Sequence, residues 1–161
     1  METTSLEGRY VRESVSEYSE LALPNDANMH GNVLGGKIMH LVDLAGAITA
    51  MRHCRNPVVT ASVDHMEFIN PVKIGQLVRL HAAVNRAFRT SMEVGVRVMM
   101  EDPLSGRQQH VSSAFLTFVA VDKEGHGVAV PPVIPETEEE QRAFQEAGAR
   151  RDYRLQNRRR G

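Results

Sequence analysis

One long apolar helical segment followed by four segments of alternating polarity most constrains the fold of this chain. From Gly36 to about His53, apolar residues recur at helical spacing, and the opposite side of the segment is nearly as apolar. A helix that is apolar all round is expected to be buried on all sides. Asn56 and Pro57 end it, because a residue before proline disfavours helical backbone angles.

Alternation with a period of two begins directly after this helix and predicts strands. The segments run from Val59 to Phe68, Val78 to Asn85, Met92 to Met100 and about Val111 to Val121, and Arg9 to Leu23 supplies a candidate first strand. Short turns join consecutive segments, so the sequence predicts an α+β fold in which the helix packs on a five-stranded antiparallel sheet. One helix cannot cover both faces of such a sheet, so we also expect a homo-oligomer.

Length, charge and cysteine content exclude several classes of protein. With 161 residues and a formal net charge of −1, the chain is sized for one core and has no broad cationic surface for nucleic acid or an anionic membrane. Cys54 is the single cysteine, which rules out an internal disulfide. The sequence has no apolar run of about 20 residues and no secretory signal. We therefore expect a soluble cytoplasmic protein that does not bind membranes.

After Val121 the chain changes character and becomes a loop rich in Gly and Pro. We expect a single domain of residues 1–133 and a C-terminal segment of residues 134–161. "ETEEEQRAFQEAGAR" has acidic residues in its first turns and Arg later, as suits a short helix. The final "RRDYRLQNRRRG" is basic and is expected to fray. A nucleic-acid-binding arm is the alternative interpretation of this tail, but a charged tail is more often only solvated.

The segment "GNVLGGKI" nearly matches a phosphate-binding P-loop. Ile38, however, occupies the position where a Ser or Thr hydroxyl would have to hold magnesium. The preceding residues do not form a buried parallel strand, and no alternation of strands and helices follows. We therefore reject a nucleotide hydrolase of the P-loop type.

A better interpretation is that Gly35 and Gly36 open the long helix. Glycines leave the first amides of a helix accessible, and these donors can polarise a carbonyl group. Asp43 lies about two turns further on, within apolar sequence, where a carboxylate is costly unless something engages it. From the residues alone, both a catalytic carboxylate and a buried Asp satisfied by backbone or hydroxyl donors stay open.

Three separated stretches resemble, in order and spacing, the broad-specificity and cytosolic acyl-coenzyme A thioesterases of the hot-dog fold. They are "PNDANMHGNVLGGKIMHLVDLAGAITAMRH", "VVTASVDHMEFINPVKIGQLVRLHAAV" and "RTSMEVGVRV". The resemblance implies a double hot-dog dimer as the minimal active unit, assembled further into a hexamer. It also implies hydrolysis of acyl-CoA to a carboxylic acid and free coenzyme A. No separate cofactor is expected, because coenzyme A is part of the substrate and of the product.

The resemblance also assigns roles to residues of the first stretch. The catalytic carboxylate of the family falls on Asp43 and its catalytic Asn on Asn28, with the two acting across the dimer interface. Asp43 would act as general base or nucleophile, and the amides near Gly35 and Gly36 would polarise the thioester. A non-catalytic acyl-CoA or nucleotide sensor on the same fold is the alternative function, and a purely structural oligomer is disfavoured because it has no need of this carboxylate.

Further substrate contacts are implied in the two later stretches. Ser62 and Asp64 would lie beside the thioester and pantetheine, although cross-strand hydrogen bonding explains them equally well. Arg89, Thr90 and Ser91 would lie near the nucleotide end of coenzyme A, where a guanidinium can pair with phosphate; an ordinary surface turn is the alternative. The histidines and Cys54 show no metal-ligand spacing, so no metal site is expected.

Overall fold

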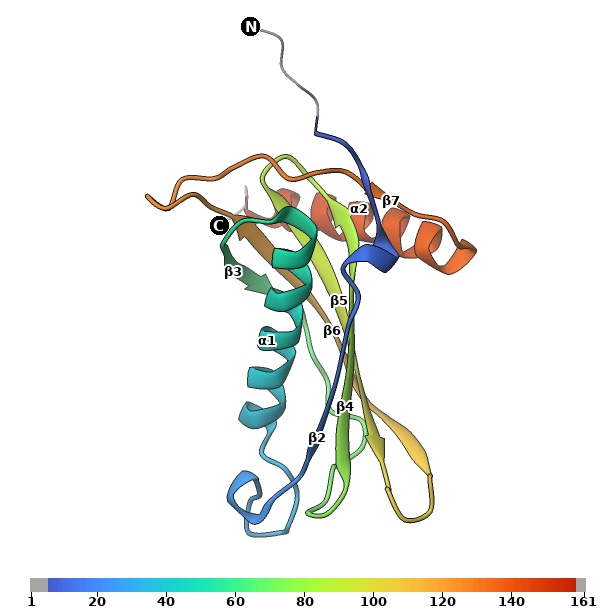
Figure 1. Ribbon diagram of the computed structural model, residues 1–161. Coiled ribbons are helices and arrows are strands. Elements are labelled where there is room, and N and C mark those ends of the chain that lie inside the picture. The colour runs from blue at the N-terminus through green and yellow to red at the C-terminus, as the bar shows by residue number, and fades with distance from the viewer. Residues whose placement is uncertain (1–5, 159–161) are drawn as a thin grey trace, which may run out of the picture.

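The computed structural model describes residues 6–158 and places α1 (Gly35–Cys54) against a five-stranded sheet (Figure 1). The strand order is β2-β4-β5-β6-β3, and all neighbouring strands are antiparallel. The strands are β2 (Ser16–Leu21), β3 (Val58–Val63), β4 (Leu77–Ala87), β5 (Ser91–Glu101) and β6 (Gln108–Ala120). This confirms the predicted α+β class and the hot-dog arrangement that the resemblance implies.

The core lies between α1 and one face of the sheet. Alternate residues of the three central strands are buried there, and cross-strand pairs such as Leu80 with Val98 and Val84 with Val94 form its layers. α1 approaches β6 so closely that a Cβ added at Gly46 would lie 2.9 Å from the ring of Phe118. Gly46 is therefore the point at which helix and sheet touch.

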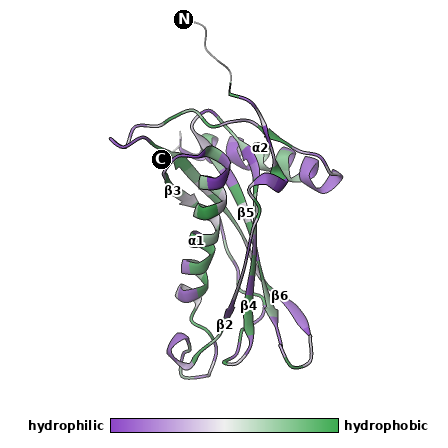
Figure 2. Cartoon of the chain, viewed as in Figure 1, coloured by the Kyte–Doolittle hydropathy of each residue, from purple (hydrophilic) through white to green (hydrophobic). Residues whose placement is uncertain are grey.

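α1 is not buried on all sides within one chain, contrary to the expectation. Its sheet-facing residues, such as Leu41 and Ala45, are buried, whereas Leu44, Ile48 and Met51 form a second apolar side that is 41% to 47% exposed. Met39 is 49% exposed as well, but it lies half a turn from Ile48 around the helix. Figure 2 shows the hydrophobic residues along α1 and the strands. The helix thus carries apolar surface that the single chain leaves in contact with water.

β3 is shorter than predicted, because it ends at Val63 rather than Phe68. The chain then runs along β6 with only isolated backbone hydrogen bonds, from Asp64 N–H to the Phe115 carbonyl and from Ile69 N–H to the Val111 carbonyl. Between them the Ser112 hydroxyl donates to the carbonyl of Glu67 at 2.6 Å. A side chain of β6 therefore replaces part of the ladder that the alternation suggested.

The predicted first strand, Arg9 to Leu23, is not one continuous strand, because β1 (Arg9–Tyr10) and β2 are separated by a turn of 3-10 helix. β1 pairs in parallel with β7 (Val133–Ile134), which was not predicted, and so ties the N-terminal segment to the segment after the sheet. Single turns of 3-10 helix lie at Val11–Glu13 and Pro24–Asp26.

α2 (Glu138–Arg158) is longer than the short helix expected, because it includes most of the basic tail. The Thr137 hydroxyl accepts the N–H of Glu140, and the Glu140 carboxylate accepts the N–H groups of Glu136 and Thr137, so a capping box starts the helix. The last residues of the tail, 159–161, lie outside the described residues. Within residues 6–158, no helix is long and apolar enough to cross a membrane.

Candidate active site

The start of α1 is open in front of its first amides. Leu34 precedes the helix and provides no side-chain cap, and the N–H groups of Lys37 and Ile38 both reach its carbonyl. A Cβ added at Gly36 would meet nothing within 4 Å, and one at Gly35 would meet only the ring of Phe68 at 3.5 Å. Accessible N–H groups together with the positive end of the helix dipole favour a carbonyl oxygen or an oxyanion there.

Asp43 is half-buried on α1, and one hydroxyl orients its carboxylate. The Thr60 Oγ1 hydroxyl donates to Asp43 Oδ1 at 2.6 Å, a short hydrogen bond of the kind typical of a charged acceptor. Within residues 6–158, Oδ2 accepts no hydrogen bond from another side chain. One oxygen is thus fixed, and the other is left for chemistry.

β3 carries a bulge at the position of this contact. Its register with β6 shifts between Thr60 and Ser62, so an extra residue, Ala61, interrupts the ladder. A bulge re-aims neighbouring side chains and is common beside active sites. Thr60 was not among the site residues predicted from the sequence. It alternates with Ser62 and Asp64 along the strand, and this shared polar side could have indicated that Thr60 also faces the site.

Asn28 lies in the loop before α1, and its side-chain oxygen is fully engaged. Oδ1 accepts the N–H of His30 at 2.9 Å and that of Asn32 at 3.2 Å. Among the described residues, the Asn28 amide nitrogen has no acceptor, so it is free to donate to a ligand. The single chain does not bring Asn28 into hydrogen-bond contact with Asp43.

An ion-pair cluster ties this loop to the first turn of α1. The Lys37 ammonium lies 2.9 Å from Glu20 of β2 and 3.5 Å from Asp26 of the loop. The hydrogen bond from Lys37, with a second from Tyr18, lowers the pKa of Glu20, and the Glu20 carboxylate in turn raises the pKa of Lys37. The loop that carries Asn28 is thereby held to the helix that carries Asp43.

The other expected substrate contacts lie at some distance from the helix start. Ser62 is half-buried on β3, and the carboxylate of Asp64 pairs with Arg154 of α2 at 2.9 Å. The corner from Arg89 to Ser91 joins β4 and β5 at the end of the sheet where α1 finishes, opposite to Gly35 and Gly36 (Figure 1). The structure therefore brings together Asp43 and Thr60, and separately Asn28 and the helix start.

One group of side chains has the composition of a metal site. Asp122, Glu124 and His126 lie in the turn after β6, with their ligand atoms within 4.8 Å of one another. Asp122 Oδ1 accepts the N–H groups of Glu124 and His126, so the turn itself accounts for their proximity. This turn follows β6 and lies outside the elements that carry Asp43 and Thr60.

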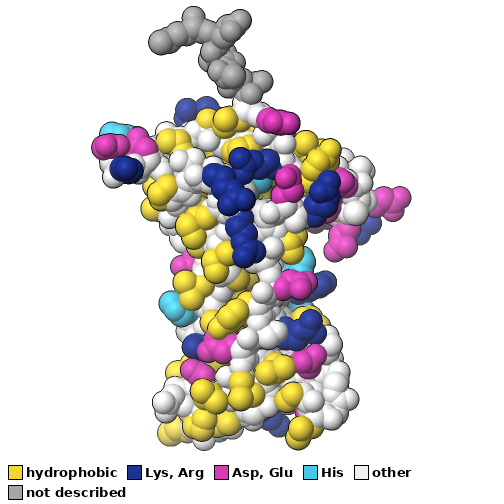
Figure 3. All heavy atoms as spheres, viewed as in Figure 1, with side chains coloured by type: hydrophobic (Ala, Val, Ile, Leu, Met, Phe, Trp, Pro, Cys, Tyr) yellow, Lys and Arg dark blue, Asp and Glu magenta, His cyan; other side chains and the backbone are white. Residues whose placement is uncertain are grey.

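Apolar side chains surround the candidate site on the surface of the single chain. Figure 3 shows hydrophobic side chains over the face formed by α1 and at the lower end of the molecule. Val59 and Val63 of β3 are 50% and 47% exposed. β3 is also an edge strand with one neighbour, β6. Exposed apolar side chains and a free strand edge are each typical of a protein interface.

Comparisons with known proteins agree with this geometry. The model of the thioesterase superfamily matches residues 30–106. YkhA of Bacillus subtilis, described as an acyl-CoA thioester hydrolase, is 41% identical over 83% of this chain and 78% of YkhA. The human cytosolic acyl coenzyme A thioester hydrolase is 35% identical over 85% of this chain, which spans only 37% of that longer protein.

Solved structures include an apo-hexameric acyl-CoA thioesterase with a TM-score of 0.91 and 39% identity, covering 94% of this chain and 97% of that one. The Staphylococcus aureus acyl-CoA hydrolase, solved with butyryl coenzyme A and coenzyme A, gives a TM-score of 0.87 and 35% identity over 93% of this chain and 92% of that one. Structures of the Asp43Ala, Asn28Ala and Thr60Ala variants of that hydrolase are also known.

Proposed function

This chain belongs to the acyl-CoA thioester hydrolases of the thioesterase superfamily, and from that premise we propose a mechanism in which Asp43 hydrolyses the thioester of acyl-CoA. The observation that carries the proposal is the 2.6 Å hydrogen bond from Thr60 to Asp43, which orients a half-buried carboxylate on an otherwise apolar helix. This chain has the same residue types at positions 28, 43 and 60 as those replaced in the S. aureus hydrolase.

In the proposed reaction, Asp43 Oδ2 removes a proton from water that attacks the thioester carbon, or attacks that carbon itself. The first course gives a tetrahedral intermediate and the second leads to an acyl-enzyme anhydride. In both, the C–S bond breaks and coenzyme A leaves as its thiolate, which takes up a proton. In the first course the water oxygen becomes part of the released carboxylic acid, and in the second a water molecule then hydrolyses the anhydride, which releases the acid and frees Asp43. Amides at the start of α1 polarise the carbonyl oxygen, and the free Asn28 amide donates to that oxygen or to the water.

The spacing along α1 favours a site shared by two chains. Gly36 and Asp43 are seven residues apart, about 10 Å along the helix axis. The amides and the carboxylate of one helix therefore cannot both contact a single carbonyl group. We place Asn28 and the helix start of one protomer opposite Asp43 and Thr60 of its partner, which makes the dimer the minimal active unit.

The exposed apolar side of α1 and the free edge of β3 supply a surface for that dimer. A trimer of such dimers is the proposed full assembly, supported by the relative solved as a hexamer. A cytoplasmic location is also part of the proposal, supported by the relative named as cytosolic. Contacts of Ser62 and Asp64 with pantetheine, and of Arg89, Thr90 and Ser91 with the nucleotide, stay predictions.

The test is thiol release from a panel of acyl-CoAs of short to long chain length, measured for wild type, Asp43→Asn and Asn28→Ala. We expect turnover by wild type and a loss of at least about 100-fold in kcat for Asp43→Asn. Asp152→Asn is the matched control, because Asp152 is exposed on α2 and pairs with no group within residues 6–158. Binding of acyl-CoA without turnover by wild type would instead identify a sensor.

A further inference from the structure

α2 is held on the outer face of the sheet by arginines rather than by apolar burial. Among its residues, 138–158, Ala147 is the one that is fully buried, and Figure 2 shows mostly hydrophilic residues along the helix. Three guanidinium groups stack on aromatic rings between α2 and the sheet. Arg150 lies 3.6 Å from the centroid of Phe115, Arg86 lies 4.1 Å from Phe144, and Arg151 lies 4.4 Å from Phe88.

The centre of this contact is a fully buried carboxylate. Glu93 of β5 is 0% exposed and accepts a bidentate hydrogen bond from Arg150, at 2.7 Å from Nη2 and 3.1 Å from Nε. The Asn85 amide donates to the same carboxylate at 3.0 Å. A buried carboxylate is strongly destabilising unless it is paired. The sheet supplies only the neutral amide of Asn85, so Arg150 of α2 provides the charge partner that Glu93 needs.

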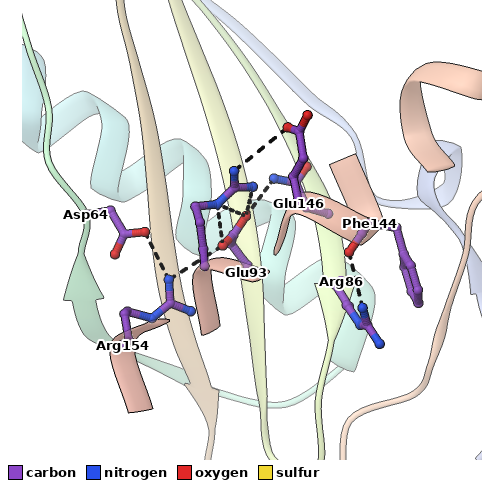
Figure 4. Close-up of polar contacts among 8 residues, drawn as sticks. Asp64, Arg86, Glu93, Phe144, Glu146 and Arg154 are labelled. Atoms are coloured by element: carbon purple, nitrogen blue, oxygen red, sulfur yellow. Dashed lines mark hydrogen bonds and ion pairs between the residues drawn. The ribbon is translucent and has the colours of Figure 1, made fainter. Parts of the chain in front are cut away.

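Arg154, one turn further along α2, connects this centre to the strand that carries Thr60. Its Nη1 lies 2.9 Å from Asp64 Oδ2 and 3.7 Å from Glu93 Oε2, so one guanidinium bridges two carboxylates (Figure 4). The Arg154 and Asp64 side chains are only 21% and 22% exposed, so solvent screens the pair weakly. Because Arg150 still neutralises Glu93, replacing Arg154 alone leaves α2 docked.

The end of β3 depends on these contacts. The strand has its bulge between Thr60 and Ser62, and only three residues separate Thr60 from Asp64. Up to Val63 the ladder with β6 holds the strand, with Ser62 opposite Thr117 and Val63 opposite Leu116. Directly after it, the Asp64 N–H donates to the Phe115 carbonyl at 2.9 Å and the Asp64 carboxylate accepts a hydrogen bond from Arg154. The Phe115 ring lies beneath Arg150, so both contacts of Asp64 involve residues that α2 contacts.

We propose that Arg154 is a positioning residue for thioester hydrolysis. It holds Asp64, and through Asp64 it fixes the bulged end of β3 at the register in which Thr60 reaches Asp43. The catalytic part of this inference rests on the proposed function; the part that concerns the strand does not. Arg154 touches neither Asp43 nor Thr60 and acts only through the strand.

Two measurements test the proposal on Arg154→Gln, Arg154→Lys and Asp64→Asn. The first is kcat and KM for thiol release, and the second is hydrogen exchange of β3, followed by mass spectrometry on peptides that contain residues 58–63. We expect Arg154→Gln to lower kcat about 10-fold with little change in KM, and to speed exchange in β3. Arg154→Lys keeps the positive charge, so its kcat and its hydrogen exchange in β3 should lie between those of Arg154→Gln and wild type. Arg142→Gln is the control, because Arg142 is exposed on the same helix and has no partner within residues 6–158.

Double variants test whether Arg154 affects kcat by way of Asp64 and Thr60. Arg154→Gln should add no further loss of kcat in Asp64→Asn or in Thr60→Ala, because each single change already breaks the same connection. Additive losses, a rise in KM alone, or unchanged exchange in β3 would overturn the proposal. If wild type shows no turnover, the proposed function fails, and hydrogen exchange alone still decides whether Arg154 holds β3.

Discussion

At the scale of single residues, the proposed mechanism depends on how one carboxylate is oriented. Asp43 projects from an apolar helix, and the Thr60 hydroxyl is its one side-chain hydrogen-bond partner within residues 6–158. A hydrogen bond to a charged group contributes about 1.5–3 kcal/mol. Thr60 is exposed on an edge strand, so the loss of this bond should lower the rate of thioester hydrolysis more than it lowers the stability of the protein.

Thr60→Val tests this orientation, because valine keeps the shape of threonine and removes the donor. We expect kcat to fall about 10- to 100-fold, which corresponds to the loss of one charged hydrogen bond, with a small change in melting temperature. Thr60→Ser retains the hydroxyl and should stay within a few-fold of wild type. Equal activity of Thr60→Val and wild type would show that the contact does not orient Asp43.

His53 gives the stability of the chain a dependence on pH. It is 1% exposed, its Nε2 lies 2.7 Å from the Pro131 carbonyl, and its Nδ1 has no partner within residues 6–158. Burial lowers the pKa of His53, and the nearby Arg9 guanidinium lowers it further. Below about pH 6.5 the unfolded chain binds a proton that the folded chain does not, so the free energy of unfolding should fall as the pH falls.

Thermal unfolding between pH 7.5 and 5.5 measures this effect. We expect the melting temperature to fall further over this interval in wild type than in His53→Gln. The neutral amide of Gln can still donate to the Pro131 carbonyl but does not titrate. Parallel pH profiles for the two proteins would contradict the assignment to His53.

The sequence singled out Asp43 as a candidate but not its hydrogen-bond partner. A carboxylate inside an apolar helix is costly, and the resemblance gave Asp43 the role that is proposed for it. Thr60 is 17 residues away from Asp43, and no local sequence pattern predicts that a strand hydroxyl contacts a carboxylate on a helix. The pair of Arg154 and Asp64 is separated by 90 residues, so the periodicity of either segment could not predict it.

At the scale of elements, the contact between α1 and β6 limits what the helix can carry. A methyl group at position 46 would lie 2.9–3.0 Å from the ring of Phe118, which is itself fully buried. Overpacking of this kind costs about 1–3 kcal/mol, which exceeds the gain of about 1 kcal/mol that Ala has over Gly in a helix.

Gly46→Ala should therefore lower the melting temperature by a few degrees, although Ala is the better helix former. The matched test is Gly46→Ala combined with Phe118→Leu, which vacates the space that the methyl group needs. We expect Phe118→Leu to lower the melting temperature less in the Gly46→Ala variant than in wild type. A melting temperature of Gly46→Ala at or above that of wild type would show that the helix shifts without cost.

The long helix and the central strands could be predicted because each has a clean period and a clear end. The ends of β3 and α2 could not. β3 stops where the Ser112 side chain takes over from the ladder. α2 continues through a basic segment because Glu93, Asp64 and the rings of Phe115 and Phe88 pair with its arginines. Tertiary partners, which no local pattern contains, decide both ends.

At the scale of the whole molecule, the apolar side of α1 and the free edge of β3 need a partner. The proposed dimer covers both and brings Asn28 of one protomer to Asp43 of the other. A charge placed on this face should prevent association and, with it, activity.

Ile48→Glu tests the interface, because Ile48 is 42% exposed in the single chain and lies on the apolar side of α1. We expect a smaller particle by size-exclusion chromatography with light scattering, and loss of thiol release. Leu104→Glu is the control, since Leu104 is 97% exposed in the loop between β5 and β6. An intact assembly of Ile48→Glu would place the interface elsewhere.

The most direct test of the shared active site is complementation between Asn28→Ala and Asp43→Ala. Each variant alone should be almost inactive, but a mixed dimer contains one site with both residues intact. Random exchange of subunits should therefore restore about a quarter of wild-type thiol release. A mixture of Asp43→Ala and Asp43→Asn, which lack the same group, should restore none. If the first mixture stays as inactive as its components, Asn28 and Asp43 act within one chain, and the proposed site is wrong.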